Sequence, residues 1–275
     1  MKGPGLFSDI GKKARDLLTR DYSYDQKLTI STYSASGVCL TSGAVKKGGL
    51  YAFDVSTQYK YKNSLVDVKI DTDSNITTTI TVSEILPSTK TITTFKLPEY
   101  NTGKLEFQYF HDHAALASVV ALKQNPVVDL SAVVGVHGVA FGAEAGFDTS
   151  SGSFTKYNAG LGLKKHEYEV SVVLADKGDT LRASYLYHID EKQASSAVAE
   201  ITRKFSTNEN IFTVGAAYEL DPLTTVKARL NNSGKLGALL QHEVSPRSVL
   251  TISGEFETKA LDRTPKFGLA LALKP

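Results

Sequence analysis

Alternation of apolar and polar residues runs through almost the whole chain after Tyr24. In residues 51–61, Tyr, Phe and Val side chains alternate with Asp, Ser, Gln and Lys, and similar runs recur from residues 66–71 through to residues 266–273. A period of two is typical of a β-strand, because successive side chains point to opposite faces of the sheet. Turn sequences such as Asn101-Thr102-Gly103 separate the runs. We therefore expect an all-β protein.

The number of runs limits the architecture further. Dividing the chain at its turns gives about nineteen strands of roughly ten residues, the length that a tilted strand needs to cross a bilayer. At about thirteen residues per strand and turn, these strands occupy nearly all of the chain after residue 24. We expect a single domain over residues 1–275, with an N-terminal helix and linker in residues 1–24 and a β-barrel in residues 25–275.

The expected size of the barrel decides which face is apolar. A single closed sheet of this many strands has a lumen too wide for side chains to fill. The apolar side chains are therefore predicted to face lipid, while the polar side chains line water. Two packed sheets of a soluble protein remain an alternative, because soluble sandwiches also alternate.

Composition disfavours several other classes of function. The net charge of +2 argues against a specific nucleic-acid site, which needs a basic excess. The one cysteine, Cys39, excludes an internal disulfide. His111 and His113 flank Asp112 without a third ligand nearby, so we expect no metal site. The chain contains no known catalytic or cofactor-binding motif, so we expect neither an enzyme nor a cofactor. No apolar run is long enough for a transmembrane helix.

The N-terminus has helical rather than β periodicity. From about Leu6 to Arg20, apolar residues recur on one face of a helix and charged residues on the other. Neither a secretory signal nor a mitochondrial transit peptide fits this segment. Two interpretations stay open here, a helix packed on a core and a helix that lines a wet channel.

Several stretches carry a resemblance to a known family. They are residues 9–19 (DIGKKARDLLT), residues 218–222 (YELDP) and residues 227–233 (KARLNNS). The C-terminus also resembles the membrane-insertion signal of organellar barrels, with Lys266, Gly268, Leu271 and Leu273 as its members. Over essentially its full length the chain resembles the voltage-dependent anion channel family, the eukaryotic mitochondrial porins, and a plant member in particular.

This resemblance implies a fold and a function. The expected fold is a transmembrane antiparallel β-barrel with its first and last strands parallel and the helix inside the lumen. Nineteen is also the strand number known for this family, so the strand count is not independent of the resemblance. The implied function is a voltage-gated, weakly anion-selective channel that passes ATP, ADP, phosphate and small metabolites by diffusion. The implied location is the mitochondrial outer membrane, with the plastid outer membrane as a further host.

The resemblance also suggests contacts and partners. The triplet Gly162, Leu163 and Lys164 resembles a family element associated with nucleotide contact. Beyond the lipid bilayer and the adenine nucleotides and small anions in transit, the implied partners are cytosolic kinases and further copies of the chain. Some family members carry a glutamate on the fourth strand where this chain has Val68, so we expect no regulation of that type.

Charged residues are the candidates for selectivity. The helix carries Lys12, Lys13, Arg15 and Arg20 against Asp9 and Asp16, four minus two, or +2. On the barrel wall the candidates are Lys60, Lys69, Lys96 and Lys104. At a constriction this surplus predicts a mild anion preference, since salt screens charge over about 8 Å. A barrel that acts as a protein-import pore and a soluble all-β binding protein remain the alternatives.

Overall fold

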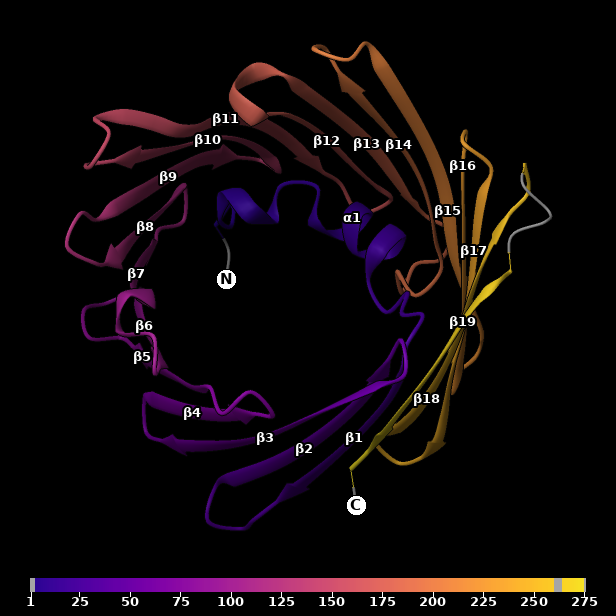
Figure 1. Cartoon of the computed structure of the whole chain (residues 1–275). Helices are drawn as coiled ribbons and strands as arrows, with labels where there is room; N and C mark the ends of the chain where they lie inside the picture. Colours follow the sequence, from indigo (N-terminus) through magenta and orange to yellow (C-terminus); the bar gives the residue numbers. More distant parts are fainter. Residues whose placement is uncertain (1–2, 260–263, 275) are drawn as a thin grey trace.

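The computed structural model describes residues 3–259 and 264–274, and over these ranges the chain forms one closed β-barrel of 19 strands (Figure 1). The strands follow one another round the ring in chain order: β1 (Gln26–Tyr33), β2 (Val38–Lys47), β3 (Leu50–Tyr61), β4 (Ser64–Asp71), β5 (Ile76–Ser83), β6 (Thr89–Leu97), β7 (Gly103–Phe110), β8 (Ala114–Leu122), β9 (Val127–Val136), β10 (Val139–Asp148), β11 (Ser153–Lys164), β12 (Tyr168–Ala175), β13 (Thr180–His188), β14 (Ser196–Lys204), β15 (Glu209–Asp221), β16 (Thr224–Asn231), β17 (Lys235–Ser245), β18 (Ser248–Glu257) and β19 (Lys266–Leu273). Short 3-10 turns, η2 (Tyr100–Thr102) and η3 (Asp176–Gly178), lie in two connections.

The barrel closes through a parallel pair. Gln26 of β1 lies opposite Leu269 of β19, and Ile30 lies opposite Leu273, whereas all other neighbouring strands are antiparallel. Each hairpin reverses the chain direction, so the first and last members of an odd set of strands run the same way. The expected barrel with a parallel seam is confirmed, and two separately packed sheets do not form.

The N-terminal segment lies inside the barrel (Figure 1). It contains a 3-10 turn, η1 (Phe7–Asp9), and a helix, α1 (Lys12–Thr19). The single helix expected from Leu6 to Arg20 is therefore wrong, because the helix is interrupted at Gly11, where φ is +68°. A side chain on Gly11 would collide with Ser171 of β12, so glycine permits both the left-handed backbone and the close approach to the wall.

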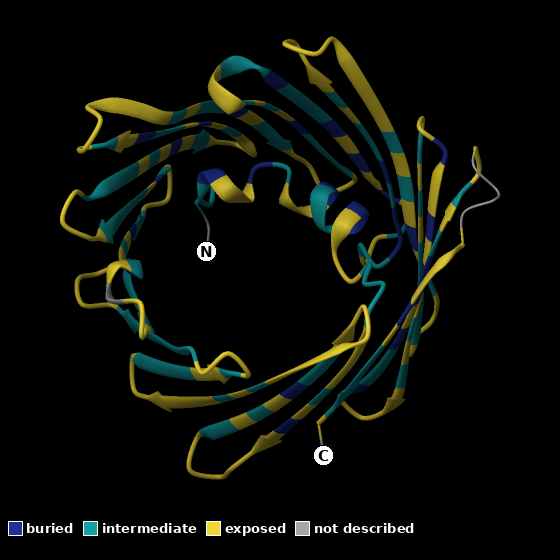
Figure 2. Ribbon diagram, viewed as in Figure 1, coloured by how far each residue is buried: buried dark blue, intermediate teal, exposed yellow. Residues whose placement is uncertain are grey.

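The contacts of α1 fix which face of the sheet is inside. Leu186, Val198 and Ala217 lie on β13 to β15 and bury α1 residues against the wall, so their side chains point into the lumen. Their strand neighbours, such as Tyr187 and Tyr218, point outward and are exposed. Strand register carries the same assignment round the ring, and many large apolar side chains are exposed at the outer positions. Figure 2 shows exposed residues along the strands all round the barrel. The predicted orientation is confirmed.

Val68 of β4 lies between the outward-facing Thr57 of β3 and Thr78 of β5. The outer face of the fourth strand therefore carries a neutral side chain at this position, as the sequence implied. In the described ranges, none of the helices has the length and apolarity required to traverse a bilayer.

Candidate functional site

The N-terminal segment docks on the inner wall through its apolar side chains. Phe7 and Ile10 pack with Val133 of β9, and the second cluster places Leu17 and Leu18 against β13 to β15. The helix therefore lines a lumen, the second of the two interpretations left open by its sequence. Removing these side chains from water stabilises the docked position by roughly 1.5–3 kcal/mol for each fully buried one.

Glycines make room for these apolar side chains. A methyl group on Gly142 of β10 would lie 2.8 Å from Phe7, and one on Gly215 of β15 would lie 2.7 Å from Leu18. These distances are too short for carbon atoms in contact. The wall is therefore shaped to receive the segment closely at both ends.

The charged side chains of the segment pair with one another or with the wall. Lys12 Nζ lies 3.3 Å from Asp9 Oδ1, and Arg20 Nη1 lies 3.8 Å from Asp16 Oδ2. Arg15 Nη2 donates a hydrogen bond of 2.9 Å to the carbonyl of Ser8. Four of the six predicted charges of the segment therefore form two separate pairs within it, Asp9 with Lys12 and Asp16 with Arg20.

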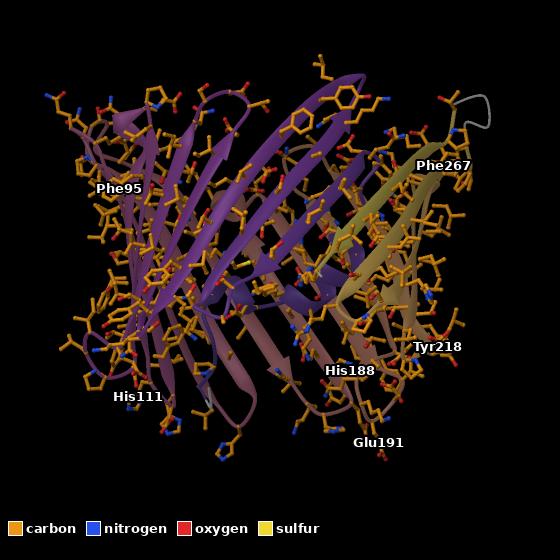
Figure 3. All side chains as sticks on the ribbon, turned by 90° about the horizontal axis from the view of Figure 1, so that it is seen from below. Phe95, His111, His188, Glu191, Tyr218 and Phe267 are labelled. Carbon is orange, nitrogen blue, oxygen red and sulfur yellow. The ribbon has the colours of Figure 1, made fainter. Side chains whose placement is uncertain are left out.

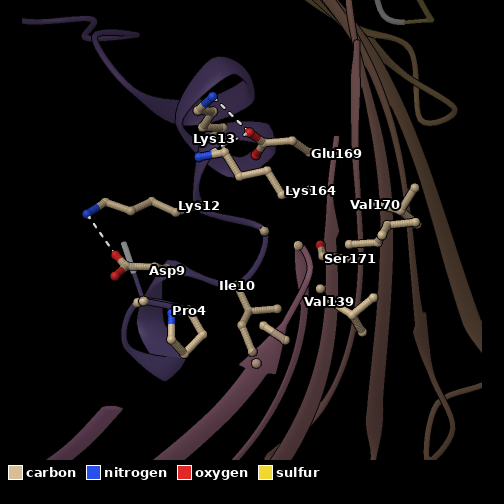
Figure 4. Close-up of a pocket in the computed structure, with 18 of the residues that line it drawn as sticks. Pro4, Asp9, Ile10, Lys12, Lys13, Val139, Lys164, Glu169, Val170 and Ser171 are labelled. Carbon is tan, nitrogen blue, oxygen red and sulfur yellow. Dashed lines mark hydrogen bonds and ion pairs between the residues drawn. The ribbon is translucent and has the colours of Figure 1, made fainter. Parts of the chain in front are cut away.

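Lys13 has a partner that sequence reasoning missed. Its Nζ lies 2.8 Å from Glu169 Oε1 of β12, and Lys164 Nζ of β11 lies 3.7 Å from the same oxygen (Figure 4). Counting Glu169 with the segment reduces its surplus to four minus three, or +1. Position 169 alternates with the outward-facing Tyr168, so the period of two could have placed it in the lumen.

The four wall lysines belong to a separate group. Lys69 of β4 and Lys96 of β6 both lie opposite Thr77 of β5, and Lys104 of β7 lies on the same face. Lys60 of β3 shares the face of Asp54, which pairs with Lys69 at 3.2 Å. In Figure 1 these strands lie across the lumen from α1, so the predicted selectivity residues form two groups on opposite walls.

Lys156 of β11 is a further lumen-facing cation that the sequence did not single out. Its Nζ lies 3.4 Å from Asp129 of β9 and 3.5 Å from Glu144 of β10. It precedes the outward-facing Tyr157, and this alternation is the signal that could have found it.

The triplet on β11 is split between the two faces. Gly162 lies opposite Ser171 and Lys164 opposite Glu169, both lumen-facing, whereas Leu163 lies opposite Val170 with its side chain outward. Gly162 and Lys164 line a cavity of about 740 Å³ between the N-terminal segment and β9 to β13, together with Lys12 and Lys13 (Figure 4). The Lys164 side chain is 67% exposed.

The predicted insertion signal lies at the barrel seam. Leu271 and Leu273 are opposite Leu28 and Ile30 of β1 on the outer face. Lys266 and Gly268 face the lumen, where Lys266 Nζ lies 3.8 Å from Glu255 of β18.

Five of the six histidines lie in or next to connections that follow odd-numbered strands, which places them at one rim of the barrel. His242 lies within β17, where its ring is hydrogen-bonded to Thr224 of β16. Figure 3 shows His111 and His188 at the end opposite Phe95 and Phe267. His111 and His113 have ring centroids 6.1 Å apart. Among the described residues no three His, Cys, Asp or Glu side chains form a group that could hold a metal ion.

Comparison with known proteins identifies the family. The sequence profile described as "Eukaryotic porin" matches residues 3–268. The chain belongs to the eukaryotic porin family. This porin is 68% identical over 275 residues to the rice "Mitochondrial outer membrane protein porin 5". The matched region covers 100% of this chain and 99% of the rice protein.

Two further relatives also align with the whole of this porin. "Mitochondrial outer membrane protein porin 2" of Arabidopsis thaliana is 64% identical over 274 residues, 100% of this chain and 99% of that protein. "Outer plastidial membrane protein porin" of pea is 52% identical over 275 residues, 100% of both chains. The resemblance read from the sequence is confirmed.

Proposed function

We propose that this porin is a voltage-gated, weakly anion-selective channel of the mitochondrial outer membrane that passes ATP, ADP, phosphate and small metabolites by diffusion. The observation that carries the proposal is the reversal of polarity across the wall, with exposed apolar side chains outside and paired charges inside. Such a wall is stable with lipid on one side and water on the other. A soluble binding protein does not fit the apolar outer face, and the relatives named porins favour a channel over a protein-import pore.

Diffusion through a water-filled lumen needs no catalytic chemistry, and the family is one of channels. Selectivity then comes from the field of the lining charges. Lys12 and Arg20 have exposed side chains in the lumen, where a passing anion meets them, whereas Lys13 is paired with the wall. Because most of these cations have carboxylate partners, the preference for anions is weak.

Voltage dependence follows from the same charges. A charge that moves across the full field changes its energy by about 2.3 kcal/mol per 100 mV. The N-terminal segment carries its charges on an element that is held by side-chain contacts, so a small displacement of it changes both the pore and the charge distribution.

Lys164 and Lys12 are the proposed contacts for nucleotide phosphates, because both line the cavity beside the segment. Ammonium groups bind phosphate oxygens as point charges. Cytosolic kinases and further copies of this chain are proposed partners on the family resemblance alone. The named relatives support the mitochondrial outer membrane as the location, and the pea protein supports the plastid outer membrane as a further one.

Recording single channels in a planar bilayer tests this function. The purified protein should give a large open-state conductance that falls at high voltage of either sign, and a reversal potential in a KCl gradient that favours chloride. Purified, folded protein that partitions into the aqueous phase of a detergent split and gives no conductance would overturn it.

A further inference from the structure

The linker between α1 and β1 is fastened to the wall by one arginine. Arg229 of β16 donates from Nη1 to the carbonyl of Leu18, at 2.6 Å, and from Nη2 to the hydroxyl of Tyr24, at 2.8 Å. The guanidinium carbon lies 4.3 Å from the centre of the Tyr22 ring. One side chain therefore contacts the end of α1 and two positions of the linker.

A carboxylate completes this group. Glu255 of β18 accepts a hydrogen bond of 2.5 Å from Tyr24 and lies 3.2 Å from Arg229 Nη2. Its side chain is only 10% exposed. Charged groups with little access to water are retained where they are paired and hydrogen-bonded, so these partners hold one another in place.

The tyrosine under the guanidinium is neutral. Burial raises the pKa of Tyr22 to about 12. At physiological pH the phenol therefore offers the guanidinium an uncharged ring face, the geometry of a cation–π contact.

The linker also contacts the wall at Gly268 of β19. The carbonyl of Ser23 lies directly over Gly268 and accepts a hydrogen bond from Ser253 of β18, and a methyl group on Gly268 would overlap that carbonyl. On the other side, Lys227 of β16 pairs with Asp21 at 3.2 Å. The lumen-facing glycine of the predicted insertion signal thus has a second use, which is close contact with the linker.

We propose that Arg229 is the positioning residue that keeps the linker, and with it the C-terminal end of α1, in the place that leaves the pore open. This inference rests on the proposed function. Every barrel strand is hydrogen-bonded to neighbours on both sides, whereas the N-terminal segment is attached to the wall by side chains. The planar fork of arginine reaches several acceptors at once, and lysine keeps the charge without the fork.

The first test is Arg229→Lys, recorded in planar bilayers beside the unmodified protein. Because the lumen charge is unchanged, the open-state conductance and the reversal potential should stay the same. The ratio of closed to open channels at a fixed voltage should rise about tenfold, as expected for the loss of about 1.4 kcal/mol. Arg182→Lys on β13 is the matched control, since Arg182 also faces the lumen but pairs with Glu200, away from the linker, and it should leave closure unchanged.

A second pair of variants tests the contact between the linker and Gly268. Gly268→Ala should displace the linker and favour closure in the same direction. Gly254→Ala on the adjacent strand should leave closure unchanged, because the added methyl group would lie at ordinary contact distances of 3.4 Å.

The outcomes distinguish the two proposals. If Arg229→Lys closes as the unmodified channel does, or alters selectivity rather than closure, the positioning role is wrong. If Gly268→Ala leaves closure unchanged, the close contact of the linker with β19 has no part in holding the pore open. If the unmodified protein forms no voltage-dependent channel at all, the proposed function fails first.

Discussion

Lys13 of α1 and Glu169 of β12 form an ion pair between the helix and the inner wall of the barrel, with Lys13 Nζ 2.8 Å from Glu169 Oε1. The pair joins the N-terminal segment to the wall and cancels one of the positive charges that the segment presents to the lumen. If the segment sets the selectivity of this porin as proposed, wall carboxylates such as Glu169 should contribute to it as well.

Glu169→Gln should make the channel more selective for anions. The substitution leaves Lys13 and Lys164 without their common partner, which adds one positive charge near the segment. We expect the chloride-to-potassium permeability ratio to rise by roughly 1.5-fold, a small change because salt screens charge within about 8 Å. Reversal potentials in a KCl gradient measure this ratio. Asp73→Asn, in the turn between β4 and β5, removes a carboxylate far from the segment and should have less effect; equal effects would contradict the assignment.

Reversing the charge of the segment should abolish the anion preference. Replacing Lys12, Arg15 and Arg20 with glutamate changes the segment from +2 to −4, since three charges each change by two units. The reversal potential should then fall to zero or change sign. An unaltered anion preference would exclude the segment as the selectivity element.

Leu18→Ala should loosen the segment without opening the barrel. Leu18 is 3% exposed and packs in the cluster with Leu186 and Val198, and truncating a buried leucine costs about 2–5 kcal/mol. A cysteine at Ala14, in a Cys39→Ser background, should then react with a water-soluble thiol reagent at least about tenfold faster. Leu230→Ala, on the outer face, is the control and should leave the rate unchanged. Equal rates in both variants would show that Leu18 does not hold α1.

The barrel could be predicted from the sequence because the alternation of apolar and polar residues, which places each side chain on one face of a strand, is visible in short stretches of sequence. Alternation in a run such as residues 51–61 assigns each side chain to a face, and the short turns leave one way for consecutive strands to pair. The break at Gly11 could not be predicted in this way. The apolar residues on both sides of it, Ile10 and Ala14, keep the spacing of one continuous helix, and the reason for the break is the approach of Gly11 to Ser171 on a distant strand.

The candidate site was predictable in composition but not in its pairing. The charges of the segment and the four wall lysines were visible as residue types, whereas their partners depend on contacts between strands far apart in sequence. Glu169 and Lys156 belong to the lumen by alternation alone. Their contacts with Lys13 and with Asp129 and Glu144 required the folded structure.

The central claim is that the apolar side chains of the strands face lipid and the polar side chains face the water-filled lumen. Spin labels at neighbouring positions of one strand test it directly. Val66 and Asp67 follow one another on β4, so their side chains lie on opposite faces of the barrel. In reconstituted protein, a label at Val66 should be relaxed by oxygen dissolved in the lipid, and a label at Asp67 by a water-soluble quencher. A label at Val66 that meets the aqueous quencher while the label at Asp67 meets lipid oxygen would contradict the account of a water-filled channel.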